Sequence, residues 1–325
     1  MTIARNAEPT GFDVVGDVHG YAEKLVGLLD KLGYELLDGA WQHPTRQAIF
    51  VGDLIDRGPQ QVRCVQIVRD MVAAGSAQIV LGNHEFNAIA WATPDPEVPG
   101  EYLRPHGGEY GADNLKQHQL FLDQVGPGSP LHHELIAWFK TIPLWLDLGE
   151  LRIIHACWNA ECLRIVQRWV SASNSMTYPL IVEGTRQDSP EFIAVEVLLK
   201  GPEIPLPSPL HYLDKDGKRR EKGRAQWWDV DATTLRRAVR IPRGAKMSDG
   251  QPFPELPDDE LPATLQPYLD AVPVIFGHYW YEGKPARISP TTACVDYSAG
   301  NRGDLVAYQW NRGDTALSNE QFVAY

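Results

Sequence analysis

Cysteine is scarce in this chain, with four among 325 residues. Cys64, Cys157, Cys162 and Cys294 show no C-x-x-C spacing. A domain of this length can bury enough apolar surface to be stable without disulfides. The cysteines therefore predict reduced thiols in a cytoplasmic protein rather than a disulfide scaffold.

Long apolar runs are also missing. No uninterrupted apolar segment approaches the length that spans a bilayer. The first ten residues, Met1 to Thr10, lack the apolar centre of a signal peptide. We therefore expect a cytoplasmic protein with no membrane partner.

The chain has fewer positively than negatively charged residues, with 30 Lys and Arg and 42 Asp and Glu, for a net charge of -12. Such a chain is attracted poorly to the nucleic-acid backbone, which argues against extended nucleic acid as a partner. If such a chain has a site for phosphate groups, that site needs a local positive field, and bound metal ions are the obvious source of that field.

The composition is otherwise that of an ordinary folded protein, with 43% hydrophobic and 22% charged residues. In the first half, short apolar runs alternate with stretches of helical periodicity, and this order predicts a layered α/β sheet. The expected strands are 12–15, 48–51 and 79–81, and the expected helices are 25–32, 62–72 and 85–91.

The second half is less regular. Further strands are expected at 151–154, 272–276, 293–297 and 305–310. Between about 159 and 270 the character changes and prolines cluster, which predicts an insertion of Pro-rich loops and a few helices. We expect a single domain, 1–325, whose core is covered by this insertion at about 159–270.

Five apolar runs end in residues that can bind metals, and this is the most informative pattern in the chain. In layered α/β folds the ligand crevice lies beyond the carboxyl ends of the strands. Glycines precede four of these residues and would let the chain turn sharply there. Each group alone has an ordinary explanation as a turn, a helix cap or a buried histidine, but five together predict a site. The groups are Asp17 with His19, Asp53, Asn83 with His84, His155, and His278.

Three of these motifs carry a family resemblance: Asp17-Val-His19-Gly, Gly-Asp53-x-x-Asp56-Arg57-Gly, and Gly-Asn83-His84-Glu. With the two later histidines, the chain resembles the calcineurin-like metallophosphoesterase superfamily. It is most similar to the phosphoprotein-phosphatase branch and to bacterial symmetrical diadenosine tetraphosphatases. The resemblance implies the metallophosphoesterase fold, which is a layered β-sandwich flanked by helices.

The resemblance also implies a ligand set for two divalent metal ions. Asp17 and His19 would bind the first metal, Asp53 would bridge both, and the second would take three further residues. These are Asn83, His155 and His278. Mixed oxygen and nitrogen ligands suit Mn, Fe, Zn or Mg rather than a metal that needs thiolates.

Two positions depart from the superfamily pattern. Many members, nucleases among them, end with Gly-His-x-His, but here Trp280 replaces the last histidine of Gly277-His278-Tyr279-Trp280. The phosphatase and tetraphosphatase branches also lack that histidine, so the departure favours them over nucleases. His155 is followed by Ala156-Cys157-Trp158, where phosphoprotein phosphatases usually have glycines.

The implied reaction is hydrolysis of phosphate esters by a hydroxide that bridges the two metals. His84 would be the general acid for the leaving group, Asp56 would orient it, and Arg57 would grip a phosphate oxygen. The substrate would be a phosphorylated small molecule, a nucleotide or a phosphoprotein. Serine/threonine protein phosphatase and dinucleoside tetraphosphatase both remain open. The alternative outside the enzymes is a binding or scaffold protein on the same fold.

A second group of residues has weaker claims to the site. They could line a substrate pocket or, among the tryptophans, stack on a base; a solvated loop or core packing explains them equally well. They are Arg104, His106, Gly107, Gly108, His118, Trp158, Arg224, Trp227, Trp228 and Asp296.

Overall fold

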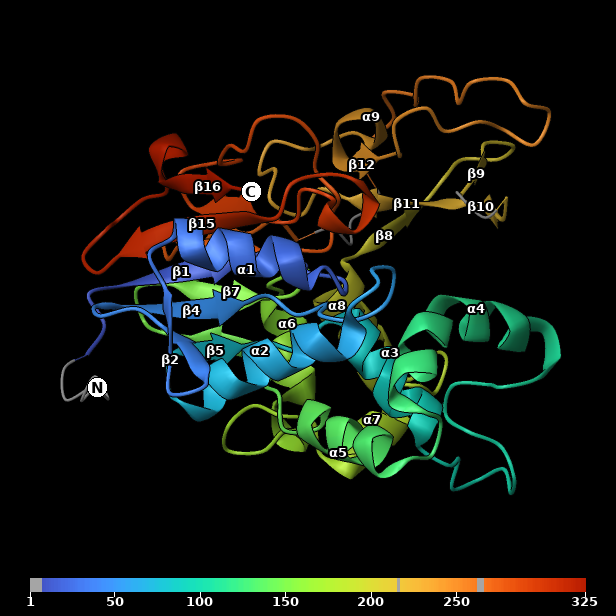
Figure 1. Ribbon diagram of the computed structural model, residues 1–325. Coiled ribbons are helices and arrows are strands. Elements are labelled where there is room, and N and C mark those ends of the chain that lie inside the picture. Colours follow the sequence, from blue (N-terminus) through green and yellow to red (C-terminus); the bar gives the residue numbers. More distant parts are fainter. Residues whose placement is uncertain (1–7, 215–216, 262–265) are drawn as a thin grey trace.

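The computed structural model describes residues 8–214, 217–261 and 266–325. Most of the N-terminal stretch assessed above, residues 1–7, lies outside the described residues, as do 215–216 and 262–265. Figure 1 shows the arrangement of the elements.

One mixed sheet carries the N-terminal strands, in the order β16-β15-β1-β4-β5. The central strands β1, β4 and β5 are parallel, whereas β15 runs antiparallel to β1 and β16 antiparallel to β15. Their bounds are β1 (Gly11–Val15), β4 (Arg46–Phe50), β5 (Ala77–Ile79), β15 (Val306–Asn311) and β16 (Phe322–Ala324).

A second sheet has the order β14-β13-β7-β6. Strand β13 is parallel to both β14 and β7, and β6 pairs antiparallel with β7. The bounds are β6 (Trp145–Asp147), β7 (Arg152–Ile154), β13 (Val274–Phe276) and β14 (Thr292–Cys294).

The two sheets pack face to face around one buried apolar cluster. Phe12 and Val14 of β1 contribute to it, as do Ile153 of β7 and Ile275 of β13. Val15 belongs to the other cluster, on the helical side of the sheet, because successive side chains of a strand alternate between faces. The expected α/β fold with a β-sandwich between helices is therefore confirmed.

Helices cover the outer faces of the sandwich. Those expected from periodicity form as α1 (Ala22–Lys31), α2 (Gln61–Ala73) and α3 (Asn83–Ala92). Two were not expected: α4 (Gly108–Val125) and α5 (Pro130–Phe139). Gly107 and Gly108 open α4 instead of forming a pocket loop. A short hairpin, β2 (Glu35–Leu37) and β3 (Ala40–Gln42), connects α1 to β4.

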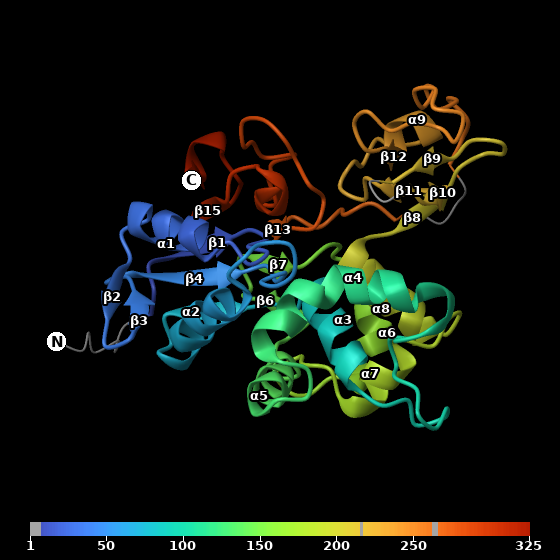
Figure 2. The same ribbon diagram turned by 45° about the vertical axis from the view of Figure 1, so that its right-hand side comes forward.

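The segment predicted as an insertion has two parts. Its first part is helical and joins the main core: α6 (Ala160–Val166), η1 (Gln167–Trp169), α7 (Tyr178–Glu183) and α8 (Pro190–Lys200). Its second part has a small apolar cluster of its own and lies apart from the helices in Figure 2. The single domain with an insertion at 159–270 stays a prediction.

That second part is built from short strands. A three-stranded sheet has the order β12-β11-β8, and a two-stranded one pairs β9 with β10. The bounds are β8 (Glu203–Pro205), β9 (Tyr212–Leu213), β10 (Arg219–Arg220), β11 (Lys222–Ala225), α9 (Leu235–Ala238) and β12 (Val239–Arg240). Two short helical turns near the C-terminus are η2 (Ala299–Asn301) and η3 (Asn319–Gln321).

The cysteines are all buried, and none is in a disulfide, as predicted. Burial raises the pKa of the Cys64 thiol to about 12, so this thiol is a core side chain. Within the described part of the chain, no helix is both long and apolar enough to cross a bilayer.

Arg46 connects three strands of the first sheet. Its guanidinium donates to Asp13 Oδ1 at 2.8 Å, to the Phe12 carbonyl at 2.8 Å and to the Trp310 carbonyl at 2.9 Å. Asp13 is fully buried. Removing one partner of a buried ion pair leaves an uncompensated charge.

Arg46→Met is therefore expected to lower the free energy of unfolding by about 3 kcal/mol. Urea unfolding measures it, with Gln47→Met as the control on the same strand. The Gln47 amide is half-buried, donates to the Gly75 carbonyl at 3.0 Å and accepts from the Gln78 amide at 2.9 Å, and neither bond involves a charge, so its loss should cost only about 1 kcal/mol. Equal stabilities of the two variants would contradict the role given to Arg46.

Candidate metal centre

The residues predicted from the strand ends come together at one edge of the sandwich. Asp17 and His19 follow β1, and Asp53 follows β4. From the second sheet, His155 follows β7 and His278 follows β13. Asn83 begins α3, just beyond β5. All six side chains are buried. Both sheets thus contribute to one cluster.

Asp53 lies at the centre of this cluster. Its Oδ2 is 3.7 Å from His19 Nε2 and its Oδ1 is 3.5 Å from His155 Nε2. Two groups of potential metal ligands share this residue: His19, Asp53 and His84, and Asp53, His155 and His278. Within each group the ligand atoms lie within 4.8 Å of one another. One carboxylate therefore has a ligand group on each side.

The ring orientations of two histidines suit metal binding. The Nδ1 of His19 is 2.9 Å from the Ile55 carbonyl, and that of His155 is 2.7 Å from the Val51 carbonyl. A carbonyl can only accept, so each Nδ1 donates and each Nε2 keeps a free lone pair toward Asp53. The Nε2 of His19 is buried without a hydrogen-bond partner. Burial and the nearby His84 lower the pKa of His19 to about 3, which keeps it in the neutral form that binds metals.

Asn83 joins the two later histidines. Its Oδ1 is 3.1 Å from His155 Nε2 and 2.9 Å from His278 Nδ1. Burial, with the charge of Arg224, lowers the pKa of His278 well below its ordinary value. Asn83 thus places an amide oxygen between two imidazoles, a donor set of the type that divalent metals take.

Asp17 adds negative charge at the same place. It lies outside the two three-residue groups, but its carboxylate accepts from the His278 backbone N–H at 3.1 Å. Burial, Asp296 and Asp53 raise its pKa well above the ordinary value. Buried carboxylates this close together are costly unless cations compensate them. The residues present therefore fit bound cations.

The backbone is strained at this edge. His19, Asp53 and His278 have φ of 49°, 52° and 69°, in the left-handed region that non-glycine residues rarely adopt. Such strain clusters at functional sites because the surrounding structure must impose it.

The glycines before the ligands act mostly by leaving space. Gly52 has a positive φ of 96°, as the predicted sharp turn requires. Gly16, Gly82 and Gly277 do not. At Gly277 an added Cβ would lie 2.1 Å from Asp17 Oδ1, and at Gly82 it would lie 2.3 Å from the Asp53 nitrogen. At these two positions a side chain in place of glycine would clash with a neighbouring candidate ligand, so glycine is needed for space rather than for its φ.

His84 and Asp56 form a tight pair beside the ligands. His84 Nδ1 is 2.5 Å from Asp56 Oδ2, and His84 Nε2 is 3.8 Å from Asp53 Oδ2. Burial lowers the pKa of His84, but Asp53 and the Asp56 hydrogen bond more than offset this and raise it. The pair thus has the geometry of an imidazole oriented by a carboxylate.

Arg57 faces the acidic cluster from the loop after Asp56. Its guanidinium lies 4.1 Å from the ring centroid of Trp280, and its Nε is buried without a hydrogen-bond partner. Trp280, at the position of the missing histidine, also donates its backbone N–H to Asp296 at 2.8 Å. Tryptophan instead of histidine at position 280 thus places an aromatic ring over the Arg57 guanidinium.

Comparison with known proteins agrees with this geometry. The family model described as calcineurin-like phosphoesterase matches residues 11–170. Over this segment the chain is similar to that family. Its match covers β1 to α6 and includes five of the six predicted ligands, all but His278. The family implies divalent metal ions, and the two ligand groups could hold them.

Relatives within the family are named bis(5'-nucleosyl)-tetraphosphatase PrpE [asymmetrical]. The one from Oceanobacillus iheyensis is 32% identical over 146 residues, which is 44% of this chain and 54% of the relative. The one from Bacillus cereus is 40% identical over 145 residues, 44% of this chain and 55% of the relative. The chain spans about half the length of the curated relatives that it matches. Their names say asymmetrical, whereas the resemblance above was to symmetrical enzymes.

A solved structure of a protein serine/threonine phosphatase from Saccharomyces cerevisiae also aligns with this chain. The alignment covers 99% of this chain and 80% of that chain, with a TM-score of 0.44 and 14% identity.

Sequence reasoning missed supporting residues of the centre. The Glu85 carboxylate accepts from the backbone N–H groups of Asp53 and Leu54, both at 2.8 Å. Burial and Asp53 raise its pKa to about 7. Gln61 Oε1 accepts from the Asp56 N–H at 2.6 Å. The sequence gives no local signal for the role of Glu85, because the two N–H groups that it accepts from lie more than 30 residues away.

The weaker candidates have mixed outcomes. Trp227 and Trp228 are 1% and 4% exposed, and Trp227 donates to the Ala156 carbonyl at 3.1 Å. They pack the insertion against the core, so the stacking role is wrong for both. Trp158 is also buried, at 8% exposure, and Arg152 lies over its ring. His106 stacks on Trp91 at 3.7 Å.

Four other candidates lie near the centre. Arg224 donates to the His278 carbonyl at 3.0 Å, and Asp296 accepts from the Ser298 and Trp280 N–H groups. Arg104 is half-buried, which lowers its pKa, and the negative charge of Asp56 partly offsets this. His118 hydrogen-bonds to Asp56.

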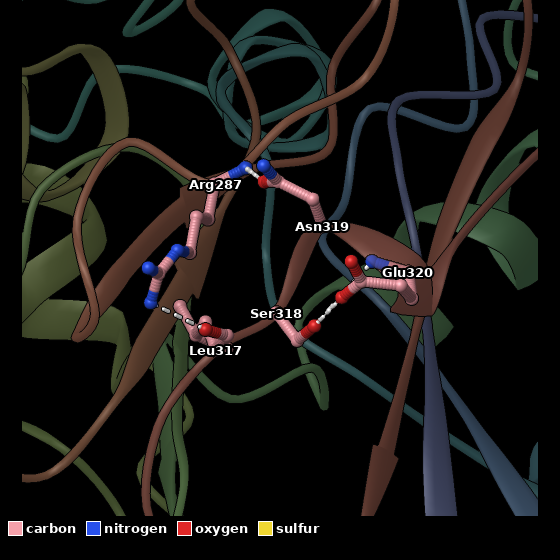
Figure 3. A pocket seen from close by; sticks show the side chains of 5 residues that line it. All are labelled: Arg287, Leu317, Ser318, Asn319 and Glu320. Carbon is pink, nitrogen blue, oxygen red and sulfur yellow. Dashed lines mark hydrogen bonds between the residues drawn. The ribbon is translucent and has the colours of Figure 1, made fainter.

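A separate surface hollow near the C-terminus is drawn in Figure 3. Arg287 Nη1 donates to the Leu317 carbonyl at 2.7 Å, and the Arg287 N–H donates to Asn319 Oδ1 at 3.0 Å. The hollow shares no residue with the metal centre, and these polar groups are bonded among themselves.

Proposed function

We propose that this protein is a metal-dependent phosphoesterase that uses two divalent cations. The observation that carries the proposal is the central position of Asp53. One of its oxygens faces the His19 side and the other faces the His155 side. A carboxylate shared in this way suits a pair of cations on opposite sides.

The ligand assignment follows these sides. Asp17, His19 and Asp53 would hold one cation, and Asp53 together with three further residues would hold a second. Those three are Asn83, His155 and His278. Oxygen and imidazole donors suit Mn, Fe, Zn or Mg. Bound cations would lower the pKa of a water molecule and offset the charge of a phosphate ester.

The residues beside the cations have defined tasks. Arg57 binds a phosphate oxygen with a guanidinium that the Trp280 ring holds in place. His84 gives its Nε2 proton to the leaving oxygen, and Asp56 fixes the ring from the Nδ1 side. The Nε2 atom of His84 would therefore face the ester, while Nδ1 is committed to Asp56.

The substrate is a phosphate ester, and among the classes of phosphate ester the nucleotides should be tested first. The relatives' names support this choice, since they specify a dinucleoside tetraphosphate as the substrate of those proteins. With Trp227 and Trp228 buried, neither is available as a base-stacking surface. Phosphopeptides and small phosphomonoesters complete the panel.

The test is to measure metal content together with hydrolysis of p-nitrophenyl phosphate, with and without added Mn²⁺. We expect about two metals per chain and a rate that falls to background with a chelator and returns with the metal. A protein that binds no metal and hydrolyses none of the esters under any cation would instead be a binding or scaffold protein.

A further inference from the structure

The Asp56 carboxylate is held by two imidazoles rather than one. His84 Nδ1 lies 2.5 Å from Oδ2, and His118 Nδ1 lies 3.0 Å from Oδ1. His84 comes from the start of α3, and His118 comes from the middle of α4. All three side chains are at most 3% exposed. The array His84–Asp56–His118 thus joins the metal centre to a helix that contributes no ligand.

The second imidazole gives Asp56 its orientation. An ionised carboxylate only accepts, so each Nδ1 in the array carries the proton. The pKa of Asp56 lies well below its ordinary value, because hydrogen bonds from His118 and His84 outweigh the effect of burial. With one donor on each oxygen, the carboxylate plane is fixed. A donor lost from Oδ1 would leave a buried acceptor unsatisfied and let the carboxylate turn away from His84.

His118 has no other polar task among the described residues. Its Nε2 is buried without a hydrogen-bond partner, and its ring lies 4.9 Å from that of Phe121 and 6.2 Å from that of Trp91. Aromatic packing sets the position of the ring, and the single polar contact goes to Asp56. A histidine kept only for packing would not need its proton aimed at that oxygen.

We propose that His118 is a positioning residue, which fixes Asp56 and through it the ring that protonates the leaving group. The inference rests on the proposed function, because it concerns how well His84 delivers a proton. It predicts an effect that depends on the leaving group, since an ester with a good leaving group needs no proton and one with a poor leaving group does.

The experiment compares His118→Leu with His118→Asn in the full chain loaded with Mn²⁺. The Asn amide nitrogen can take the place of Nδ1 as a donor to Asp56, whereas Leu of similar size cannot. Each variant is assayed for kcat on 2,4-dinitrophenyl phosphate and on phenyl phosphate.

His118→Leu is expected to lower kcat on phenyl phosphate by about 10- to 100-fold, the range for partners that orient a functional group. On the dinitrophenyl ester it should lower kcat by less than about threefold, because that leaving group departs without a proton. His118→Asn should recover most of the phenyl phosphate rate. Metal content should match that of the unmodified protein in both.

The control for helix packing is Val125→Ala. Val125 is buried in α4 two turns after His118, has no polar side-chain group and is not one of the rings that pack against His118. Its substitution should lower stability and leave the ratio of the two rates unchanged. An equal loss on both esters in His118→Leu, or an Asn variant as impaired as the Leu variant, would overturn the inference.

A second readout does not depend on activity. In the metal-free protein, the Nδ1–H protons of His84 and His118 should give two downfield proton resonances protected from exchange. His118→Leu should remove one and shift the other. A His84 resonance unaffected by the substitution would also overturn the inference. If the unmodified protein hydrolyses neither ester, the proposed function fails, while this measurement still tests the array.

Discussion

Asp53→Asn is expected to remove both cations and the hydrolytic activity together. Asparagine offers one neutral oxygen, and its NH2 group would face an imidazole lone pair on the other side. Either His19 or His155, whose Nε2 atoms lie 3.7 Å and 3.5 Å from the two carboxylate oxygens, would lose its shared partner. Asparagine tolerates the positive φ of 52° at this position, so the backbone is not further strained.

The measurement is metal content per chain beside the rate of p-nitrophenyl phosphate hydrolysis. We expect the metal content to fall from about two to below one, and the rate to fall by more than about 100-fold, the upper range for partners that only support a ligand. Asp56→Asn is the matched control, because it changes a buried aspartate three residues away that also has positive φ. It should keep its metal. An Asp53→Asn protein with two metals and normal turnover would refute the bridging role.

His84→Ala is expected to lower kcat on phenyl phosphate by about 10²- to 10⁴-fold, as expected for a lost general acid. The metal should stay bound, since His84 hydrogen-bonds Asp56 through Nδ1 and is not among the six ligands proposed. On 2,4-dinitrophenyl phosphate the loss should be much smaller. The ratio of the two rates is therefore the measurement.

The same variant decides between two roles for His84. Its Nε2 is 3.8 Å from Asp53 Oδ2, and it forms one of the two potential ligand groups with His19 and Asp53. If His84 were a ligand, His84→Ala would lose metal and would slow both esters equally. His106→Ala serves as the control, because His106 is an exposed histidine that stacks on Trp91. Near-normal rates on both esters would rule out the acid role.

Local sequence patterns predicted secondary structure correctly where a single strand or helix buries one of its faces. The periodic stretches became α1 and α2, and the apolar runs at 12–15 and 48–51 became β1 and β4. The order of polar residues after the strands located the metal centre, because parallel strands bring their carboxyl ends to one edge. These features depend on neighbours within a few residues.

Contacts between distant segments could not be predicted in this way. His118 lies 62 residues from Asp56, and the helix that carries it was not expected from the sequence. From the sequence, Trp227 and Trp228 could stack on a base, but in the structure both are buried against the core. In each case the packing partner lies far along the chain, so spacing gives no signal.

By itself, the sequence predicted the candidate donor residues, their positions at the strand ends and the family that they resemble. The tertiary structure decided which sheet supplies each candidate ligand, that Asp53 lies between two groups of potential ligands, and that Asp56 has a second histidine. The reason is physical: residue type fixes which atoms can bind a metal or a proton, whereas distance and orientation depend on long-range packing.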